Sequence, residues 1–177
     1  MVFFFKTLTK FTAAIFVLGL LFSFSTLWYF SSDLPDYKIL ANYKPSVSSR
    51  VHSGEGQLIA EYALQKRLFI PYNFVPKKVI NSFLSAEDKN FFSHPGVDAK
   101  SITRASIKNI KNIFSEKRLE GASTITQQVA KNFLLTSEVS IKRKIKEAIL
   151  AFRIERAYSK ERIMELYLNQ IYLGEGT

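Results

Sequence analysis

A run of 20 uncharged residues near the N-terminus, Phe11 to Phe30, places the strongest constraint on what this chain can fold into. A run of that length can cross the hydrocarbon core of a bilayer as one helix. Lys6 and Lys10 precede it and Asp33 and Asp36 follow it, so the N-terminus is predicted to lie in the cytoplasm and the rest of the chain outside. A cleaved signal peptide is the alternative, although no small-residue cleavage site follows the run.

Charge and composition exclude several classes of function. The net charge is +10, from 25 Lys and Arg against 15 Asp and Glu. There is no Cys, and His52 and His94 are the only histidines, which excludes a thiolate nucleophile, disulfides and a His-rich metal site. Any general base must therefore be a carboxylate, Lys or Tyr. A basic chain outside the membrane meets anionic and phosphorylated lipids, so no nucleic-acid partner is expected unless the topology is reversed.

The remaining pattern predicts a mainly α fold with a small β element before the helices. We expect four parts: a cytoplasmic tail at 1–10, a transmembrane helix at 11–30, a linker and β hairpin at 31–70, and a helical domain at 71–177. The hairpin turn is predicted at Ser53 to Gly56, and the last helix is predicted to run to about Tyr172 and stop at Gly174.

Four residues are predicted to cap helices of this domain. They are Asp98, Ser140, Ser159 and Thr124, the last forming a capping box with Gln127. The helix that follows Ser140 carries an apolar stripe that we expect to point into the core: Ile141, Ile145, Ile149 and Phe152.

Glu87 is the first candidate for chemistry. In the helix predicted over 76–88, helical spacing places it on the same stripe as Ile80 and Phe83. A carboxylate there is either lifted out of the stripe by the end of the helix or buried for a purpose. A partly dry carboxylate is a candidate general base, and we expect that environment for Glu87.

The helix predicted after Gly121 presents a polar face. Thr124, Gln128 and Lys131 share this face, with Gln127 at its edge. A hydroxyl, amides and an ammonium near a helix start suit phosphate or sugar oxygens. A solvated helix surface without a ligand is the alternative.

A second charged cluster is predicted on the helix after Ser140, where Arg143, Lys144 and Glu147 lie together. The cations should keep Glu147 ionised, and the group could hold an anion. An exposed ion pair of little consequence is the alternative. His94, taken alone, is predicted to be a structural hydrogen-bonding residue.

Four blocks of sequence together resemble the peptidoglycan glycosyltransferase domain (glycosyltransferase family 51) of class A penicillin-binding proteins. In chain order they are Glu87-Asp88-x-x-Phe91-x-x-His94-x-Gly96-Val97-Asp98, Gly121-Ala122-Ser123-Thr124-Ile125-Thr126-Gln127-Gln128, Arg143-Lys144-x-x-Glu147, and Lys160-x-x-Ile163-Met164-Glu165-x-Tyr167-Leu168-Asn169. The resemblance runs from about Leu34 to the end of the chain, and it implies a lysozyme-like helical domain.

The resemblance also implies a reaction. The family polymerises lipid II, a disaccharide-pentapeptide on a polyprenyl pyrophosphate, with inversion at the donor anomeric carbon. Glu87 would be the general base, and Glu147 would orient the surrounding groups or a divalent cation, Mg²⁺ or Mn²⁺, that comes with the substrate pyrophosphate. No tightly bound cofactor is implied. Glu165 and Asn169 would support the cleft. Substrate-binding roles would fall to Asp88, Phe91, His94, Ser123, Thr124, Gln127, Gln128, Lys131, Arg143 and Lys144, with Asp88 and His94 bracing the loop that places Glu87.

The implied setting is the bacterial cytoplasmic membrane, with one membrane span and the catalytic domain on the periplasmic side. The partners would be lipid II, the growing glycan chain, the membrane and other cell-wall synthesis proteins. The basic stretch from Lys100 to Lys111 would lie near anionic lipid. Because the family continues beyond the segment that ends here at Thr177, we expect the chain to be a truncated member.

Two other functions stay open from the sequence. A lysozyme-like lytic enzyme would also use a glutamate on a helix, but its substrate has no pyrophosphate to need the cations. A non-catalytic, membrane-anchored remnant would only bind partners or lipid II.

Overall fold

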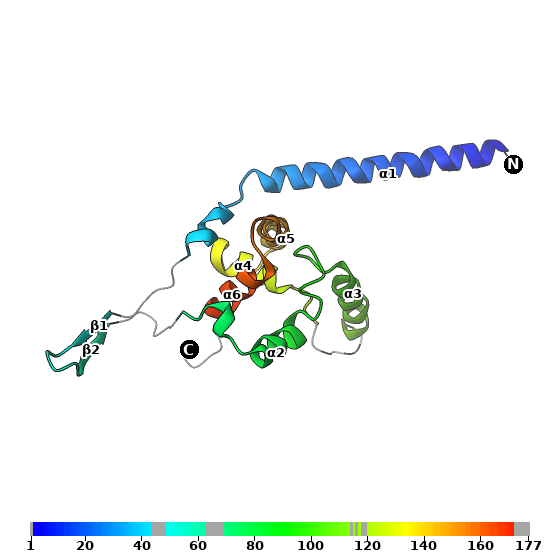
Figure 1. Ribbon diagram of the computed structural model, residues 1–177. Helices are drawn as coiled ribbons and strands as arrows, with labels where there is room; N and C mark the ends of the chain where they lie inside the picture. The colour runs from blue at the N-terminus through cyan, green and yellow to red at the C-terminus, as the bar shows by residue number, and fades with distance from the viewer. Residues whose placement is uncertain are drawn as a thin grey trace.

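The computed structural model describes residues 2–43, 49–62, 69–113, 115, 117 and 120–171. Figure 1 shows a long N-terminal helix, α1, that extends away from a bundle of shorter helices, and a small hairpin that projects from the other side. The predicted mainly α fold with one apolar N-terminal helix and a small β element is thereby confirmed.

Helix α1 spans Val2–Ser31, and its part from Lys10 to Ser31 is long and apolar enough to cross a membrane by length and composition. In that part no residue is buried by the rest of the protein, as expected for a helix whose apolar residues face lipid. The end of α1 contacts α5: Lys146 Nζ donates to the Asp33 carboxylate at 2.7 Å, and Arg153 donates to the Ser31 hydroxyl.

The hairpin pairs β1 (Ser49–His52) with β2 (Leu58–Tyr62) in antiparallel register, Ser49 opposite Tyr62. Gly56 in the turn has φ +84°, a conformation that favours glycine. The predicted hairpin and its turn are confirmed, whereas the rest of the predicted extended piece, 63–68, lies outside the described residues.

The segment predicted as a linker is partly built into the helical body. It forms a short 3-10 helix, η1 (Tyr37–Asn42), whose Leu40 is buried in the core. Arg162 donates to the Leu40 carbonyl at 3.1 Å, and the Tyr158 hydroxyl donates to the Tyr37 carbonyl at 3.0 Å. Proline and serine content alone does not predict this docking, because it depends on two distant side chains that supply the donors.

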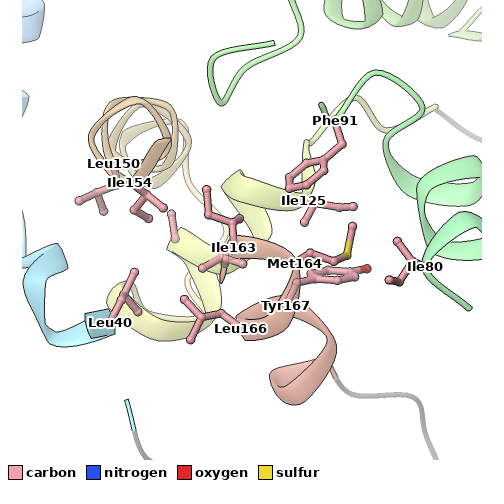
Figure 2. Close-up of a cluster of buried hydrophobic side chains, with 12 residues drawn as sticks. Leu40, Ile80, Phe91, Ile125, Leu150, Ile154, Ile163, Met164, Leu166 and Tyr167 are labelled. Carbon is pink, nitrogen blue, oxygen red and sulfur yellow. The ribbon is translucent and has the colours of Figure 1, made fainter. Parts of the chain in front are cut away.

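The helical body contains η2 (Tyr72–Phe74), α2 (Lys77–Glu87), α3 (Ala99–Ile113), α4 (Ile125–Leu134), α5 (Ile141–Ala157) and α6 (Lys160–Gln170). Figure 2 shows the core at the centre of this body, where side chains of α4, α5 and α6 meet Leu40 and Ile80. Fully burying one such aliphatic side chain stabilises the fold by roughly 1.5–3 kcal/mol. The fully buried members include Leu150 and Ile154 of α5, Ile125 of α4, and Ile163, Met164 and Leu166 of α6.

The predicted helix starts are confirmed by their side-chain caps. Thr124 and Gln127 form the capping box of α4, and Ser140 and Ser159 accept from the backbone N–H groups of Arg143 and Arg162. Asp98 accepts from the backbone N–H of Ser101 at the start of α3. Helix α6 ends at Gln170, before the predicted stop, and residues 172–177 lie outside the described part of the chain.

The predicted inward face of α5 is wrong. Ile141 is 83% exposed and Phe152 45% exposed, whereas Glu147, Leu150, Ala151 and Ile154 are buried. Helix α5 has apolar residues on two faces, and periodicity alone cannot tell which face meets the core. The predicted stripe instead lines an apolar groove of about 530 Å³ that it shares with Leu27 of α1, Ile102 of α3 and Val97.

The loop between α2 and α3 approaches α5 closely at Gly96. Gly96 has φ +102°, and a Cβ there would lie 2.8 Å from the backbone carbonyl group of Ala151. Both the conformation and the contact require glycine. The Thr124 hydroxyl donates to the Gly96 carbonyl at 2.6 Å, which ties the loop to the start of α4.

We expect Gly96→Ala to lower the free energy of unfolding by about 2–4 kcal/mol, because the strained φ and the clash with rigid helix backbone add. Denaturant titration measures this value. The matched control is Gly54→Ala in the hairpin, where a Cβ meets nothing within 4 Å, and its effect should stay within about 0.5 kcal/mol. Equal effects of the two substitutions would contradict the close approach.

Candidate active site

Glu87 is the last residue of α2 and is exposed. The expectation of a partly buried carboxylate is therefore wrong. Helix α2 ends at this position, so the side chain leaves the stripe that buries Ile80 and half-buries Phe83, and the first of the two alternatives applies. The Gln128 amide donates to Glu87 Oε2 at 2.8 Å, which connects the end of α2 with the exposed face of α4.

Asp88 and His94 clamp the loop that follows Glu87. His94 Nδ1 accepts from the Gly96 N–H at 3.1 Å, so the ring proton is on Nε2 and is donated to the Asp88 carboxylate at 2.9 Å. The same carboxylate accepts from the Ile125 N–H at 3.1 Å, at the start of α4. Both side chains are buried, so these bonds are shielded from water.

Phe91 and His94 do not line the cleft of about 930 Å³ that other predicted site residues share. Phe91 is fully buried, with its ring edge-on to Phe92 and His94, and belongs to the core cluster. The predicted substrate contact of these two residues does not fit this placement, because neither side chain reaches the surface of the cleft. Their place in the structure is that of supports for the loop.

Helix α4 supplies two kinds of polar group to the cleft. Thr124 and Gln127 are buried and engaged in the capping box, where Gln127 Oε1 accepts from the Thr124 N–H at 3.0 Å. Gln128 and Lys131 lie one turn apart on the more exposed side. The capping pair therefore fixes the start of the helix, and Gln128 and Lys131 are the members that a ligand can reach.

Helix α5 supplies a cationic group centred on a buried acid. Glu147 is 2% exposed and binds two cations: Arg143 donates to Oε1, and Lys144 Nζ donates to Oε2 at 2.7 Å. Lys144 also donates to the Ser123 hydroxyl at 2.5 Å. Partial burial lowers the pKa of Lys144, and the positive charges of Arg143 and Lys131 lower it further. The exposed ion pair considered above is excluded, because its acid is buried.

These groups line one cleft of about 930 Å³. Glu87 with its partner Gln128 and the cations of α4 and α5 are all among the residues that line it. Of the predicted site residues, those that the structure brings together here are Glu87, Asp88, Ser123, Thr124, Gln127, Gln128, Lys131, Arg143, Lys144 and Glu147. Glu165 and Asn169 lie outside it: they accept from the backbone N–H groups of Tyr72 and Ile70 and so fix the chain before α2 onto α6.

The cleft also contains residues whose role the sequence did not suggest. Asp98, predicted only as a helix cap, accepts from the Asn90 amide at 2.8 Å and from the Ser101 hydroxyl at 2.7 Å. These bonds hold the pKa of Asp98 well below its usual range. Arg104 and Lys108 of α3 line the cleft as well, and Lys108 pairs with Glu120 at 2.5 Å. The sequence did not predict that Arg104 and Lys108 line the cleft. Helical periodicity does not show which face of α3 is turned toward it.

Comparison with known proteins places the chain in a family. Residues 55–177 match the family model described as Transglycosylase. The chain is 55% identical over 150 residues to penicillin-binding protein 1A of Rickettsia felis, which covers 85% of this chain and 19% of the relative. The protein of the same name from Rickettsia bellii is 52% identical over 167 residues, which cover 94% of this chain and 21% of the relative. The one from Aquifex aeolicus is 47% identical over 144 residues, which cover 81% of this chain and 19% of the relative. The chain thus spans about a fifth of the length of these relatives. With the family match extending over most of its length, the chain belongs to the transglycosylase family.

Proposed function

We propose that the cleft is the active site of a peptidoglycan glycosyltransferase that joins lipid II units into glycan strands. One observation carries the proposal: a carboxylate at the end of α2 and a cationic group on α4 and α5 line the same cleft. The family description and the name shared by the relatives support the same reaction class.

Glu87 is the general base in this reaction. It takes the proton of the 4-hydroxyl of the acceptor sugar as that oxygen bonds to C1 of the donor chain. The bond from C1 to the pyrophosphate oxygen breaks on the opposite side, which inverts the configuration. Gln128 orients the base through its bond to Oε2, and exposure of Glu87 leaves the carboxylate open to an incoming hydroxyl.

The cations stabilise the departing lipid pyrophosphate. Negative charge develops on the leaving oxygen, and fixed positive groups that need no reorganisation lower the barrier most. Arg143 and Lys144 are held in place by Glu147, and Lys131 approaches from α4. A lytic enzyme acting on finished glycan has no such charge to stabilise, so the cationic group favours synthesis over lysis.

The surroundings of Glu147 do not fit a divalent cation. Both of its carboxylate oxygens accept from Arg143 and Lys144, and their positive charges would repel the metal ion. Within the described ranges no group of three or more His, Cys, Asp or Glu side chains forms a metal site. Glu147 instead positions the two cations.

The substrate's lipid carrier accounts for helix α1. A polyprenyl chain stays in the bilayer, so an enzyme that is anchored beside it need not extract it. We place the N-terminus in the cytoplasm and the cleft on the outer side of the cytoplasmic membrane, from the Lys residues before the span and the Asp residues after it.

Incubation of the anchored protein in liposomes with lipid II tests the proposal. We expect glycan chains of increasing length on gel electrophoresis, with release of the lipid pyrophosphate. Finished glycan added to the same protein should keep its length. Shortening of that glycan would favour the lytic alternative, and no change in either substrate would favour the non-catalytic one.

The basic residues of α3 are expected to hold the domain near anionic lipid. Replacing Lys100, Arg104, Lys108 and Lys111 with Gln in an anchor-free form should weaken binding to anionic liposomes by at least about tenfold, since each cation near the surface contributes about 1 kcal/mol. The contribution of Lys108 to lipid binding should be smaller than that of the other three, because Lys108 is paired with Glu120. Liposome sedimentation measures the change, with Lys77→Gln and Lys78→Gln on α2 as the control. Unchanged binding would show that α3 has no such role.

A further inference from the structure

We propose that Lys160 is a positioning residue for Glu87, acting through the loop from Asp88 to Asp98; this inference rests on the proposed function. Lys160 is the first residue of α6 and lies outside the cleft. It belongs to one of the resembling blocks, but the sequence pattern predicts no role for it.

The ammonium of Lys160 has partners in three directions. Nζ donates to the His94 carbonyl at 2.8 Å and to Glu155 Oε1 at 2.8 Å, and it lies 4.5 Å from the centre of the Phe91 ring. An ammonium has three N–H donors and is attracted to the face of an aromatic ring. Two points of the loop, at Phe91 and His94, are therefore held by one group.

The Lys160 site is connected to the helices around it. Glu155 of α5 also accepts from the Thr126 hydroxyl of α4 at 2.5 Å, so α4, α5 and α6 all contribute to the position of the ammonium. The side chains of Glu155 and Lys160 are 7% and 19% exposed. In such a place the geometry of an ion pair is fixed more firmly than at the surface, where water competes for both charges.

Helix stability does not explain a lysine here. A cation at the first position of a helix faces the positive end of the helix dipole, which is unfavourable. A buried ion pair also costs desolvation, and apolar residues of similar size are often as stable. The property that an apolar residue cannot supply is the hydrogen bond to the His94 carbonyl, because that carbonyl needs a donor.

The path from Lys160 to the base is short. Lys160 holds the His94 carbonyl, the His94 ring holds the Asp88 carboxylate, and Asp88 directly follows Glu87. Without the ammonium, the loop keeps the Asp88–His94 bond but loses its attachment to α6. The expected effect is a displaced Glu87 carboxylate with an unchanged cationic group on α5.

The test separates positioning from stability. Lys160→Met alone removes the ammonium and leaves the buried Glu155 carboxylate without its cation, although the Thr126 hydroxyl still donates to it. The triple variant Thr126→Val, Glu155→Met, Lys160→Met removes the whole polar group at once, which should restore most of the melting temperature. We expect kcat for lipid II polymerisation to fall ~10- to 100-fold in both variants, since small displacements of a reacting group have effects of this size, with KM changed by less than about threefold.

Recovery of kcat together with the melting temperature in the triple variant would overturn the proposal, because Lys160 would then act on stability alone. A loss expressed mainly in KM would also overturn it. Lys78→Met, an exposed lysine on α2, is the matched control and should leave kcat unchanged. The unaltered protein and Glu87→Gln in the same assay keep the two proposals apart. If the unaltered protein polymerises lipid II, Glu87→Gln does not, and the triple variant has full activity, then only the role of Lys160 is overturned.

Chemical rescue gives a second test in case the triple variant does not fold. The chain has no cysteine, so Lys160→Cys introduces a single thiol. Alkylation with 2-bromoethylamine restores an ammonium at nearly the length of lysine, whereas iodoethane adds a neutral group. In protein that mass spectrometry shows to be fully converted, kcat should rise at least about tenfold after aminoethylation only. Equal kcat after the two treatments would overturn the proposal.

Discussion

Glu87→Gln should abolish polymerisation of lipid II while leaving its binding largely intact. Glutamine keeps the size of the side chain and can still contact Gln128, but it cannot accept the proton of the attacking hydroxyl. Loss of a general base lowers the rate by ~10²- to 10⁴-fold. The measurement is the initial rate of glycan formation, together with the affinity for fluorescent lipid II on the same protein.

The structure sharpens this expectation, because Glu87 is exposed and stands at a helix end. Its replacement removes no buried contact, so the melting temperature should stay unchanged. A change of rate then reports chemistry alone. Glu55→Gln, in the exposed turn of the hairpin, is the control for loss of one negative charge. A Glu87→Gln protein that keeps more than about a tenth of the rate would show that another group takes the proton.

The sequence predicted those parts of the fold and site that depend on local pattern. The helix caps at Thr124, Ser140 and Ser159 rest on hydrogen bonds within one turn, and all three are present. The cluster of Arg143, Lys144 and Glu147 depends on spacing along one helix, and it is also present. Such features need no knowledge of how distant segments pack.

The parts that the sequence did not predict depend on contacts between distant segments. Periodicity predicts that Ile141 and Phe152 face inward on α5, whereas the core takes Leu150 and Ile154 because α4 and α6 lie on that side. Helical periodicity predicts partial burial of Glu87, because it does not show that α2 ends at this residue. The link from Lys160 to the His94 carbonyl spans 66 positions of sequence and has no local signature.

Glu147→Gln should have the second large effect, and it should act on both stability and substrate binding. The buried carboxylate accepts from Arg143 with one oxygen and from Lys144 with the other. Glutamine keeps one acceptor but turns an NH₂ group toward the other cation. One of the two neighbouring positive charges is then left without an acceptor. Removing one partner of a buried ionic group lowers the free energy of unfolding by about 3 kcal/mol, a value at the lower end because Lys144 is half exposed.

The effect of Glu147→Gln on lipid II should depend on pH in a direction that the structure fixes. The pKa of Lys144 is already lowered by burial and by Arg143 and Lys131, and loss of the carboxylate lowers it further. A lysine with a lower pKa loses its charge at lower pH, so affinity for the pyrophosphate should decline earlier in the variant as the pH is raised. KM measured across the alkaline range tests this, and parallel profiles for the two proteins would contradict it.

A double variant separates the two effects of Glu147. In Glu147→Gln with Lys144→Met, the unpaired cation is removed, so Arg143 can use the remaining amide oxygen and part of the lost stability should return. Substrate affinity should fall further, because the pyrophosphate has lost a cation outright. Stability and affinity would thus move in opposite directions between the single and the double variant. If they instead recover together, Glu147 acts as a structural residue of α5, and the leaving group must be stabilised by Lys131 and the α3 cations that face the same cleft.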